Sequence, residues 1–426
     1  MTIKPQNFEE NLIWYYIIGT YGWYFLGAQF VLGPAIAWFL ILYLCKKLWN
    51  QTENTPPPEK VTIPFSVWVW VVSMLIIEFT ILVNHVDFDL GTIRTIFSSI
   101  NWSRHHALMA LFPLIGCLNI RPQLVYRAIC IVALQSLVFI IVAYVASLLK
   151  IPAETLYVSP FRIAGSNPSL YSVQLYYLEN KSQVRMLLFA PWAPALGLIA
   201  NVYFFLAYQE SNRKWRLIGM IGSVAMIVVS ISRAAWVCFP VTLFLTLFLV
   251  TFTQPITQIT AGLVSFLTGI FAPQLINWLS TLRENFDNAR LASSSVRKVL
   301  GEIGIYRWWN EAPIWGHGIQ DVGPQVVERM PIGSHHTWVG LLFTYGLVGF
   351  IAQATPLLWS FLDLLIKAQK SKTARAGLST ILVLVIMSFA ENIEYLAYLY
   401  WPGLLIMGIA FKEVVYDFRK SVVPIG

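Results

Sequence analysis

The residues best suited to chemistry lie between Arg297 and Gly349, where a long polar segment runs into an apolar one. Arg297 is followed by the turn sequence Gly316-His317-Gly318 and then by the pair His335-His336. Arginine binds phosphate oxygens through a planar fork of donors, and histidine exchanges a proton close to neutral pH. A polar insert between apolar runs of membrane length is costly unless it acts at the membrane surface. We therefore expect the chemistry of this chain to be centred on this segment.

Arg233 is a further candidate because it lies between two apolar runs. The sequence Ser230-Ile231-Ser232-Arg233 leaves almost no loop to carry the guanidinium group into water. A guanidinium at that depth must reach the surface or find an anion, and a phosphate fits its fork. The alternative is an internal carboxylate partner, either Glu391 or Glu394. The sequence thus predicts that Arg233 binds a phosphate or one of these two carboxylates.

Composition indicates the class of protein. Hydrophobic residues make up 57% of the 426 residues, charged residues only 12%, and 17 residues are tryptophan. These values exclude an ordinary soluble protein and give no indication of nucleic-acid binding. Apolar runs of about 17–25 residues recur along the chain, which is the length that crosses a bilayer as a helix. Because only helices and closed barrels satisfy their backbone groups in lipid, we expect an all-α membrane protein.

The whole chain, residues 1–426, is predicted to form a single integral-membrane domain of about twelve transmembrane helices. The expected spans are residues 12–26, 28–45, 64–83, 105–119, 127–149, 186–207, 217–231, 234–252, 257–279, 337–364, 377–391 and 395–411. The break at 27–33 is weak, so residues 12–45 form either one span or two. The segment 280–336 is expected to be a large loop, with short helices across the mouth of the bundle and a turn at Pro313 to Gly318. The polar residues of that loop include Arg290, Ser293, Ser294 and Ser295.

Basic residues in short loops predict the orientation of the chain. They follow the second, sixth, tenth and last expected spans: Lys46, Lys47, Lys60, Arg213, Lys214, Arg216, Lys367, Lys370, Lys372, Arg375, Lys412, Arg419 and Lys420. If twelve spans alternate, these groups share one side with both termini, and the positive-inside rule makes that side cytoplasmic. All six histidines then fall in or beside the longer segments of the opposite side, 84–104, 150–185 and 280–336. We therefore expect a multi-pass protein of the cytoplasmic membrane whose active face is extracytoplasmic.

Several of these motifs occur together, in the same order, in one known family. The motifs are Ser232-Arg233-Ala234-Ala235-Trp236, Arg297 sixteen residues before Pro313, Gly316-His317-Gly318, His335-His336-Thr337-Trp338 and Tyr345-Gly346-Leu347-Val348-Gly349. This ordered set resembles the O-antigen ligase and O-antigen polymerase superfamily of bacterial envelope proteins. The stretch Arg162-Ile163-Ala164-Gly165-Ser166-Asn167-Pro168 resembles the arginine-glycine-asparagine stretch of that family. The chain departs from the family pattern at His336, where asparagine is usual, and at Gly301, where tryptophan is common.

The resemblance implies a fold like that of the GT-C glycosyltransferases and a reaction that needs neither a metal nor another cofactor. Members of the superfamily transfer a glycan from undecaprenyl pyrophosphate to a hydroxyl acceptor, such as another glycan or a lipid A-core. By this resemblance, Arg162, Arg233 and Arg297 bind the pyrophosphate of the donor and His335 is the catalytic base. The residues expected in support are His336, Glu391 and Glu394. Membrane lipids are the remaining expected partners.

Two questions stay open at the level of sequence. A transporter or a lipid-glycan flippase also suits about twelve helices, and some members of the superfamily are labelled inorganic-carbon transporters. Transporters place polar residues near the bilayer midplane and often have repeated halves, whereas this chain concentrates its polar residues on one face. Within the enzyme class, a ligase, a polymerase and a protein-glycosylating transferase share the donor chemistry and differ in the acceptor.

Overall fold

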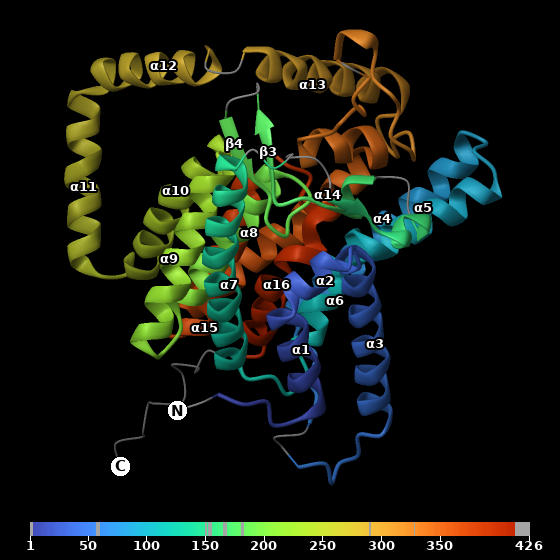
Figure 1. Cartoon of the computed structure of the whole chain (residues 1–426), viewed down its shortest axis with the longest axis vertical. Coiled ribbons are helices and arrows are strands. Elements are labelled where there is room, and N and C mark those ends of the chain that lie inside the picture. Colours follow the sequence, from blue (N-terminus) through green and yellow to red (C-terminus); the bar gives the residue numbers. More distant parts are fainter. Residues whose placement is uncertain are drawn as a thin grey trace, which may run out of the picture.

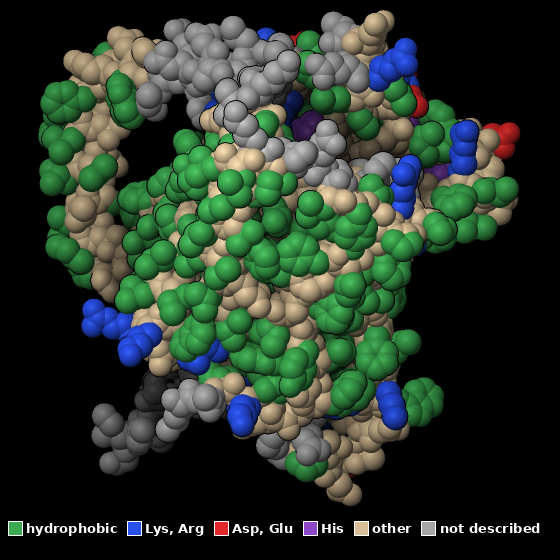
Figure 2. All heavy atoms as spheres, viewed as in Figure 1, with side chains coloured by type: hydrophobic (Ala, Val, Ile, Leu, Met, Phe, Trp, Pro, Cys, Tyr) green, Lys and Arg blue, Asp and Glu red, His purple; other side chains and the backbone are tan. Residues whose placement is uncertain are grey.

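The computed structural model describes residues 3–56, 60–149, 151, 156–164, 168–179, 183–288, 291–327 and 329–413. Figure 1 shows a bundle of upright helices, with helices α12 and α13 lying across one end and helix α11 standing apart at the side. The strands β3 and β4 lie at the same end as α12 and α13. Figure 2 shows hydrophobic side chains covering the middle of the face in view, with lysine and arginine side chains towards both ends. This distribution is the one that a bilayer requires.

The helices follow the apolar runs of the sequence. Their bounds are α1 (Phe8–Ile18), α2 (Thr20–Phe25), α3 (Gln29–Trp49), α4 (Phe65–Asp87), α5 (Thr92–Arg104), α6 (His106–Ile115), α7 (Pro122–Leu148), α8 (Ala193–Tyr208), α9 (Arg213–Ser230), α10 (Arg233–Thr251), α11 (Pro255–Ile270), α12 (Ala272–Asn288), α13 (Leu291–Glu311), α14 (Thr337–Ala368), α15 (Lys372–Met387) and α16 (Ala397–Phe411). The short 3-10 helices among the described residues are η1 (Pro160–Ala164), η2 (Pro168–Leu170), η3 (Gln325–Val327) and η4 (Ile393–Leu396). Side-chain oxygens cap the first turns of α1, α9, α10 and α15, as is usual for asparagine and serine at such positions.

Two small antiparallel sheets interrupt the helices between α7 and α8. Strand β1 (Tyr157–Val158) pairs with β2 (Ser172–Val173), and β3 (Tyr176–Glu179) pairs with β4 (Gln183–Met186). The second pair is a hairpin in which Tyr176 lies opposite Met186. The expected span at 186–207 therefore begins later than predicted, because its first residues complete this hairpin and a turn before α8.

Among the described helices, six are long and apolar enough to cross a membrane: α3, α4, α7, α10, α14 and the continuous segment Ile393–Phe411. A seventh crossing results if α11 and the first part of α12, which meet at a bend of 80°, count as one. Each of the twelve expected spans contains a helix, but α1, α6, α8 and α15 have only 10–16 residues. At 1.5 Å per residue these helices are shorter than a hydrocarbon core of about 30 Å. The prediction of an all-α, multi-pass membrane protein is confirmed, and the number twelve stays a prediction.

Residues 12–45 form two antiparallel arms rather than one helix. The chain reverses at Gly27, which has a φ of 63°, so that the end of α3 lies beside the start of α1. The ring of Phe8 is 6.1 Å from that of Phe39, centroid to centroid, and Nζ of Lys47 is 2.6 Å from Oε1 of Glu9. The question that the sequence left open for this region is thereby answered in favour of two segments.

Contacts at the end of the bundle opposite α13 join parts of the chain that are far apart in sequence. The pairs are Glu9 with Lys47, Glu10 with Arg121, Arg127 with Glu210, and Lys412 with the carbonyl oxygen of Leu118. The basic residues Arg419 and Lys420 lie outside the described residues.

The polar segment 280–336 contains the end of α12, helix α13, the short helix η3 and the turns between them. Helix α13 crosses the end of the bundle (Figure 1). It packs against the first turn of α14, where a Cβ added to Gly304 would meet Cγ1 of Val339 at 2.8 Å. Arg290 lies outside the described residues, and the side chains of Ser293, Ser294 and Ser295 are likewise not described.

Candidate functional site

Helix α14 is broken at Gly346, and the turn between Pro313 and Gly318 fills the break. Gly346 has φ 64° and ψ −163°, a conformation that is essentially restricted to glycine. The amides of residues 347 and 348 donate to the carbonyl oxygens of residues 313 and 314, and the amides of 317 and 318 donate to the carbonyls of 343 and 344. These four hydrogen bonds satisfy backbone groups that the break would otherwise leave unpaired in an apolar environment.

The histidine of this turn stabilises the loop. The His317 ring stacks on Phe343 with a centroid distance of 4.3 Å, and its Nε2 lies 2.8 Å from a carboxylate oxygen of Glu311. Glu311 also pairs with Arg307 at 2.9 Å, and Arg307 pairs with Asp321 at the same distance. The Gly316-His317-Gly318 motif thus fixes the path of the polar segment onto α14.

The start of α14 is bound to the connection between α15 and α16. The hydroxyl of Thr337 donates to the carbonyl oxygen of Glu391 at 2.8 Å and accepts from the amide of Ile393 at 2.9 Å. The indole of Trp338 donates to the hydroxyl of Ser388 at 2.8 Å. Residues just before Thr337 are therefore placed beside Glu391 by bonds from two consecutive side chains.

His335 lies two residues before this anchored position and has a strained backbone. Its φ of 63° is rare for a residue with a Cβ atom and costs about 1–3 kcal/mol. Burial, together with the nearby charge of Arg297, lowers the pKa of His335 to about 4. The imidazole is consequently neutral at pH 7, and it is close to a permanent cation.

Glu391 is buried at the same place, with only 2% of its surface exposed. Its Oε2 accepts a hydrogen bond of 2.9 Å from the indole nitrogen of Trp192, whereas its Oε1 is buried without a partner among the described residues. Burial raises the pKa of Glu391 to about 7, against the opposing effects of Arg297, the Trp192 hydrogen bond and Arg185. Arg297 of α13 thus acts on both His335 and Glu391.

Arg185 of strand β4 joins this group to the turn between α9 and α10. Its side chain is buried and donates to the carbonyl oxygens of Ser230 and Ile231 at 3.2 and 3.3 Å. Ile231 has a φ of 48°, which is unfavourable for a β-branched residue. The turn leads directly into Arg233, which is the first residue of α10, is partly exposed and has polar interactions of its own.

The predicted site residues therefore fall into two groups. The charge of Arg297 acts on both His335 and Glu391. The charge of Arg185 also acts on Glu391, and its side chain donates to the turn that carries Arg233. Arg162 lies on η1, where its backbone amide donates to the carbonyl oxygen of Ser159. Its side chain is exposed, and we find no hydrogen bond or ion pair between that side chain and a described residue. Residues 165–167 of its motif lie outside the described part of the chain.

The predicted supporting residues serve the local structure. His336 caps α14, since its Nδ1 accepts from the amide of Val339 at 3.4 Å. Both carboxylate oxygens of Glu394 have polar neighbours. Oε1 accepts from the amide of Asn392 at 3.2 Å, and Oε2 lies 3.3 Å from the hydroxyl of Thr337, whose single proton it shares with the carbonyl oxygen of Glu391. Glu394 differs in this respect from Glu391.

The remaining histidines have local partners or aromatic neighbours. Nε2 of His85 lies 3.0 Å from the hydroxyl of Ser98, and the rings of His105 and His106 contact Tyr395 and Tyr345. Across the described residues, no three side chains of histidine, cysteine, aspartate or glutamate are grouped as a metal ion would require.

Two residues of this site, Arg185 and Trp192, were not predicted. Both flank the start of an apolar run, where an arginine and a tryptophan are common as interfacial anchors. Nothing in the sequence connects Trp192 with Glu391, which is 199 residues away.

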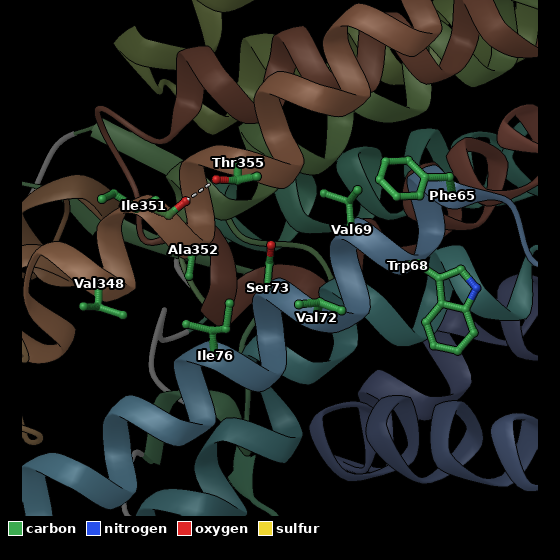
Figure 3. A pocket seen from close by; sticks show the side chains of 10 residues that line it. All are labelled: Phe65, Trp68, Val69, Val72, Ser73, Ile76, Val348, Ile351, Ala352 and Thr355. Carbon is green, nitrogen blue, oxygen red and sulfur yellow. Dashed lines mark hydrogen bonds between the residues drawn. The ribbon is translucent and has the colours of Figure 1, made fainter.

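A separate apolar groove lies between α4 and α14 and has a volume of 480 Å³. Figure 3 shows the lining side chains of α4, from Phe65 to Ile76, facing those of α14, from Val348 to Thr355. The hydroxyl of Thr355 donates a hydrogen bond to the carbonyl oxygen of Ile351 in the same helix. None of the residues of the charged site lines this groove.

These observations describe a multi-pass membrane protein with a basic, histidine-containing candidate site at one end of its helical bundle. Residues 218–354, about a third of the chain, match the profile of the O-antigen ligase family. This match confirms the resemblance to the O-antigen ligase and polymerase superfamily. The matched segment contains Arg233, Arg297, His335 and the broken helix. No curated protein matches the chain.

Proposed function

We propose that this protein transfers a glycan from undecaprenyl pyrophosphate to a hydroxyl acceptor, in the manner of an O-antigen ligase or polymerase. The observation that carries the proposal is the convergence at one end of the bundle. Arg297 of α13 acts on both the buried carboxylate of Glu391 and the strained His335, and Arg185 of β4 acts on Glu391 as well. Arg185 also binds the turn that leads into Arg233. Cations and a proton acceptor are the two requirements of a reaction that expels a pyrophosphate and deprotonates a hydroxyl.

In this proposal the arginines bind the donor. Arg297 is exposed on α13 and Arg233 begins α10, so both can reach a pyrophosphate that lies at the surface of the membrane. Guanidinium groups stay charged and bind phosphate oxygens in pairs, so they stabilise the negative charge that develops on the leaving group. Arg162 would join them from η1.

His335 contacts the acceptor in the same proposal. Its imidazole is neutral near pH 7 because of its lowered pKa, so one ring nitrogen is free to accept a hydrogen bond from a hydroxyl. The positive charge of Arg297 disfavours a second positive charge on this ring. His335 therefore orients the acceptor without competing for the pyrophosphate.

The orientation proposed from the basic loops puts this end of the bundle outside the cytoplasmic membrane, with both termini in the cytoplasm. No sugar nucleotides are present there, so an activated glycan must arrive on its own lipid carrier. The GT-C-like fold and the identity of the acceptor, whether glycan, lipid A-core or protein, belong to the same proposal. A transporter would instead need its charged site near the middle of the membrane.

The test is transfer from a purified undecaprenyl pyrophosphate-linked oligosaccharide in nanodiscs, with a chelator present. The wild-type protein should form product, and Arg233→Ala should lower the rate at limiting donor by about 10-fold or more, since it removes a charge-assisted contact. Uptake of the same compound into sealed vesicles is measured in parallel. Uptake without product formation would overturn the proposal in favour of transport.

A further inference from the structure

We propose that Glu391 is the catalytic base of this protein, accepting the proton of the acceptor hydroxyl through its Oε1 atom. The inference rests on the proposed glycan transfer and assigns the proton to a residue other than His335. Three structural features support it: the unused oxygen of Glu391, the groups that surround it, and the state of His335.

The unused oxygen is the first feature. A carboxylate oxygen that is buried without a hydrogen-bond donor is costly, the more so when the group is charged. Oε1 of Glu391 is in this condition among the described residues, although Oε2 of the same group is bound by Trp192. An acceptor hydroxyl is a donor of the required kind. The acceptor hydroxyl would therefore supply the hydrogen-bond donor that Oε1 of Glu391 lacks.

The surroundings of Glu391 are the second feature, because they fix its position while leaving it able to take up a proton. The charged groups near it are Arg297 of α13 and Arg185 of β4, and its neutral contacts are Trp192 before α8 and Thr337 of α14. On its own segment, Glu394 is occupied by Thr337 and Asn392. The two arginines keep an ionised form accessible in spite of burial, and burial keeps its proton affinity high.

The comparison with His335 is the third feature. A general base works best when its pKa is near the working pH. The pKa of Glu391 is raised to about 7, whereas that of His335 is lowered to about 4. A histidine that is so weakly basic orients the hydroxyl better than it removes the proton.

The chemical step balances without a further reactant. The acceptor oxygen forms a bond with the anomeric carbon of the donor sugar while the bond from that carbon to the pyrophosphate oxygen breaks. The electron pair of the broken bond leaves with undecaprenyl pyrophosphate, whose charge the arginines stabilise. The proton of the hydroxyl passes to Oε1 of Glu391 and is later released to water.

The pH dependence of kcat/KM for glycan transfer tests the inference on the unaltered protein in nanodiscs. A base must be ionised, so the rate should rise with pH and level off above about 7, with a gain of about 100-fold from pH 5 to pH 8. With His335 as the base the rise would end near pH 4, and the profile would be flat from pH 5 to pH 8. A flat profile would overturn the role of Glu391 and leave the proposed transfer intact.

Two variants separate Glu391 from other groups that titrate near neutrality, including the donor phosphates. Glu391→Gln should lose about 10²–10⁴-fold in rate together with the rising limb, while added formate should restore part of the rate to Glu391→Ala. Glu394 is the matched buried carboxylate. In Glu394→Gln, kcat/KM should still rise with pH up to about 7, whatever the effect of the substitution on the absolute rate. If kcat/KM of Glu391→Gln still rose with pH as in the wild type, the inference would be refuted. Absence of any transfer by the wild type would refute the proposed function first, and the inference with it.

Discussion

The break in helix α14 leads us to predict that replacing Gly346 destabilises the protein. In Gly346→Ala, the added Cβ would lie 2.3 Å from the carbonyl oxygen and 2.5 Å from the carbonyl carbon of Ile314. Both atoms belong to the backbone and cannot turn away. The backbone conformation of Gly346 adds about 1–3 kcal/mol of strain for alanine, and overpacking typically costs about 1–3 kcal/mol more. We expect a total loss of about 2–6 kcal/mol in stability.

The assay is thermal unfolding of the purified protein in detergent, followed by intrinsic tryptophan fluorescence. Gly346→Ala should lower the unfolding temperature by several degrees. Gly262→Ala in α11 is the matched control, because a Cβ there meets nothing within 4 Å, and alanine is favoured over glycine in a helix by about 1 kcal/mol. Equal unfolding temperatures for Gly346→Ala and the wild type would refute the claim that the backbone conformation of residue 346 and the close approach of Ile314 require glycine.

Three further predictions concern the charged site and the loop. Trp192→Phe removes the donor to Oε2 of Glu391, which stabilises the ionised form, so the rising limb of the pH–rate profile should move to higher pH; an unmoved limb would contradict this. Thr337→Val leaves the carbonyl oxygen of Glu391 and the amide of Ile393 without their partner, and chemical unfolding should show a loss of about 1–3 kcal/mol. His317→Ala removes the contact of the ring with Glu311, so limited proteolysis of the segment between α13 and α14 should become faster, and an unchanged cleavage rate would count against its structural role.

The sequence predicted the helical bundle well because apolar runs determine where helices form in a membrane. It could not predict the break at Gly346, since Val339 to Phe350 is a continuous apolar run and only the turn from Pro313 makes the break favourable. Nor could it predict how many of the helices span the bilayer, because the shorter helices α6, α8 and α15 depend on neighbours for their burial. The separation of α11 from the bundle was likewise not apparent from its hydropathy.

The candidate site was predictable to the extent that its residues are chemically unusual for their place in the chain. Arg233 stood out because charge is costly between apolar runs, and His335 stood out because it ends a polar insert and histidine exchanges a proton close to neutral pH. Glu391 was suggested only as a supporting partner, since its isolation from hydrogen-bond donors depends on contacts among α8, α13 and α14. Arg185 was missed because its bonds go to carbonyl oxygens of the turn before α10, and such bonds leave no pattern in the sequence.

The central claim is that the site around Arg297 binds the pyrophosphate of a lipid-linked donor. The most direct measurement is the affinity of undecaprenyl pyrophosphate for the wild type, for Arg297→Ala and for Lys298→Ala in nanodiscs of neutral lipid. Lys298 is the neighbouring exposed cation and lies 3.9 Å from Glu302, so it serves as the matched control. Arg297→Ala should weaken binding by about 10–100-fold, as expected for a hydrogen bond to a charged group, while Lys298→Ala should bind as the wild type does. Unchanged binding by Arg297→Ala, or equal weakening in both variants, would contradict the account.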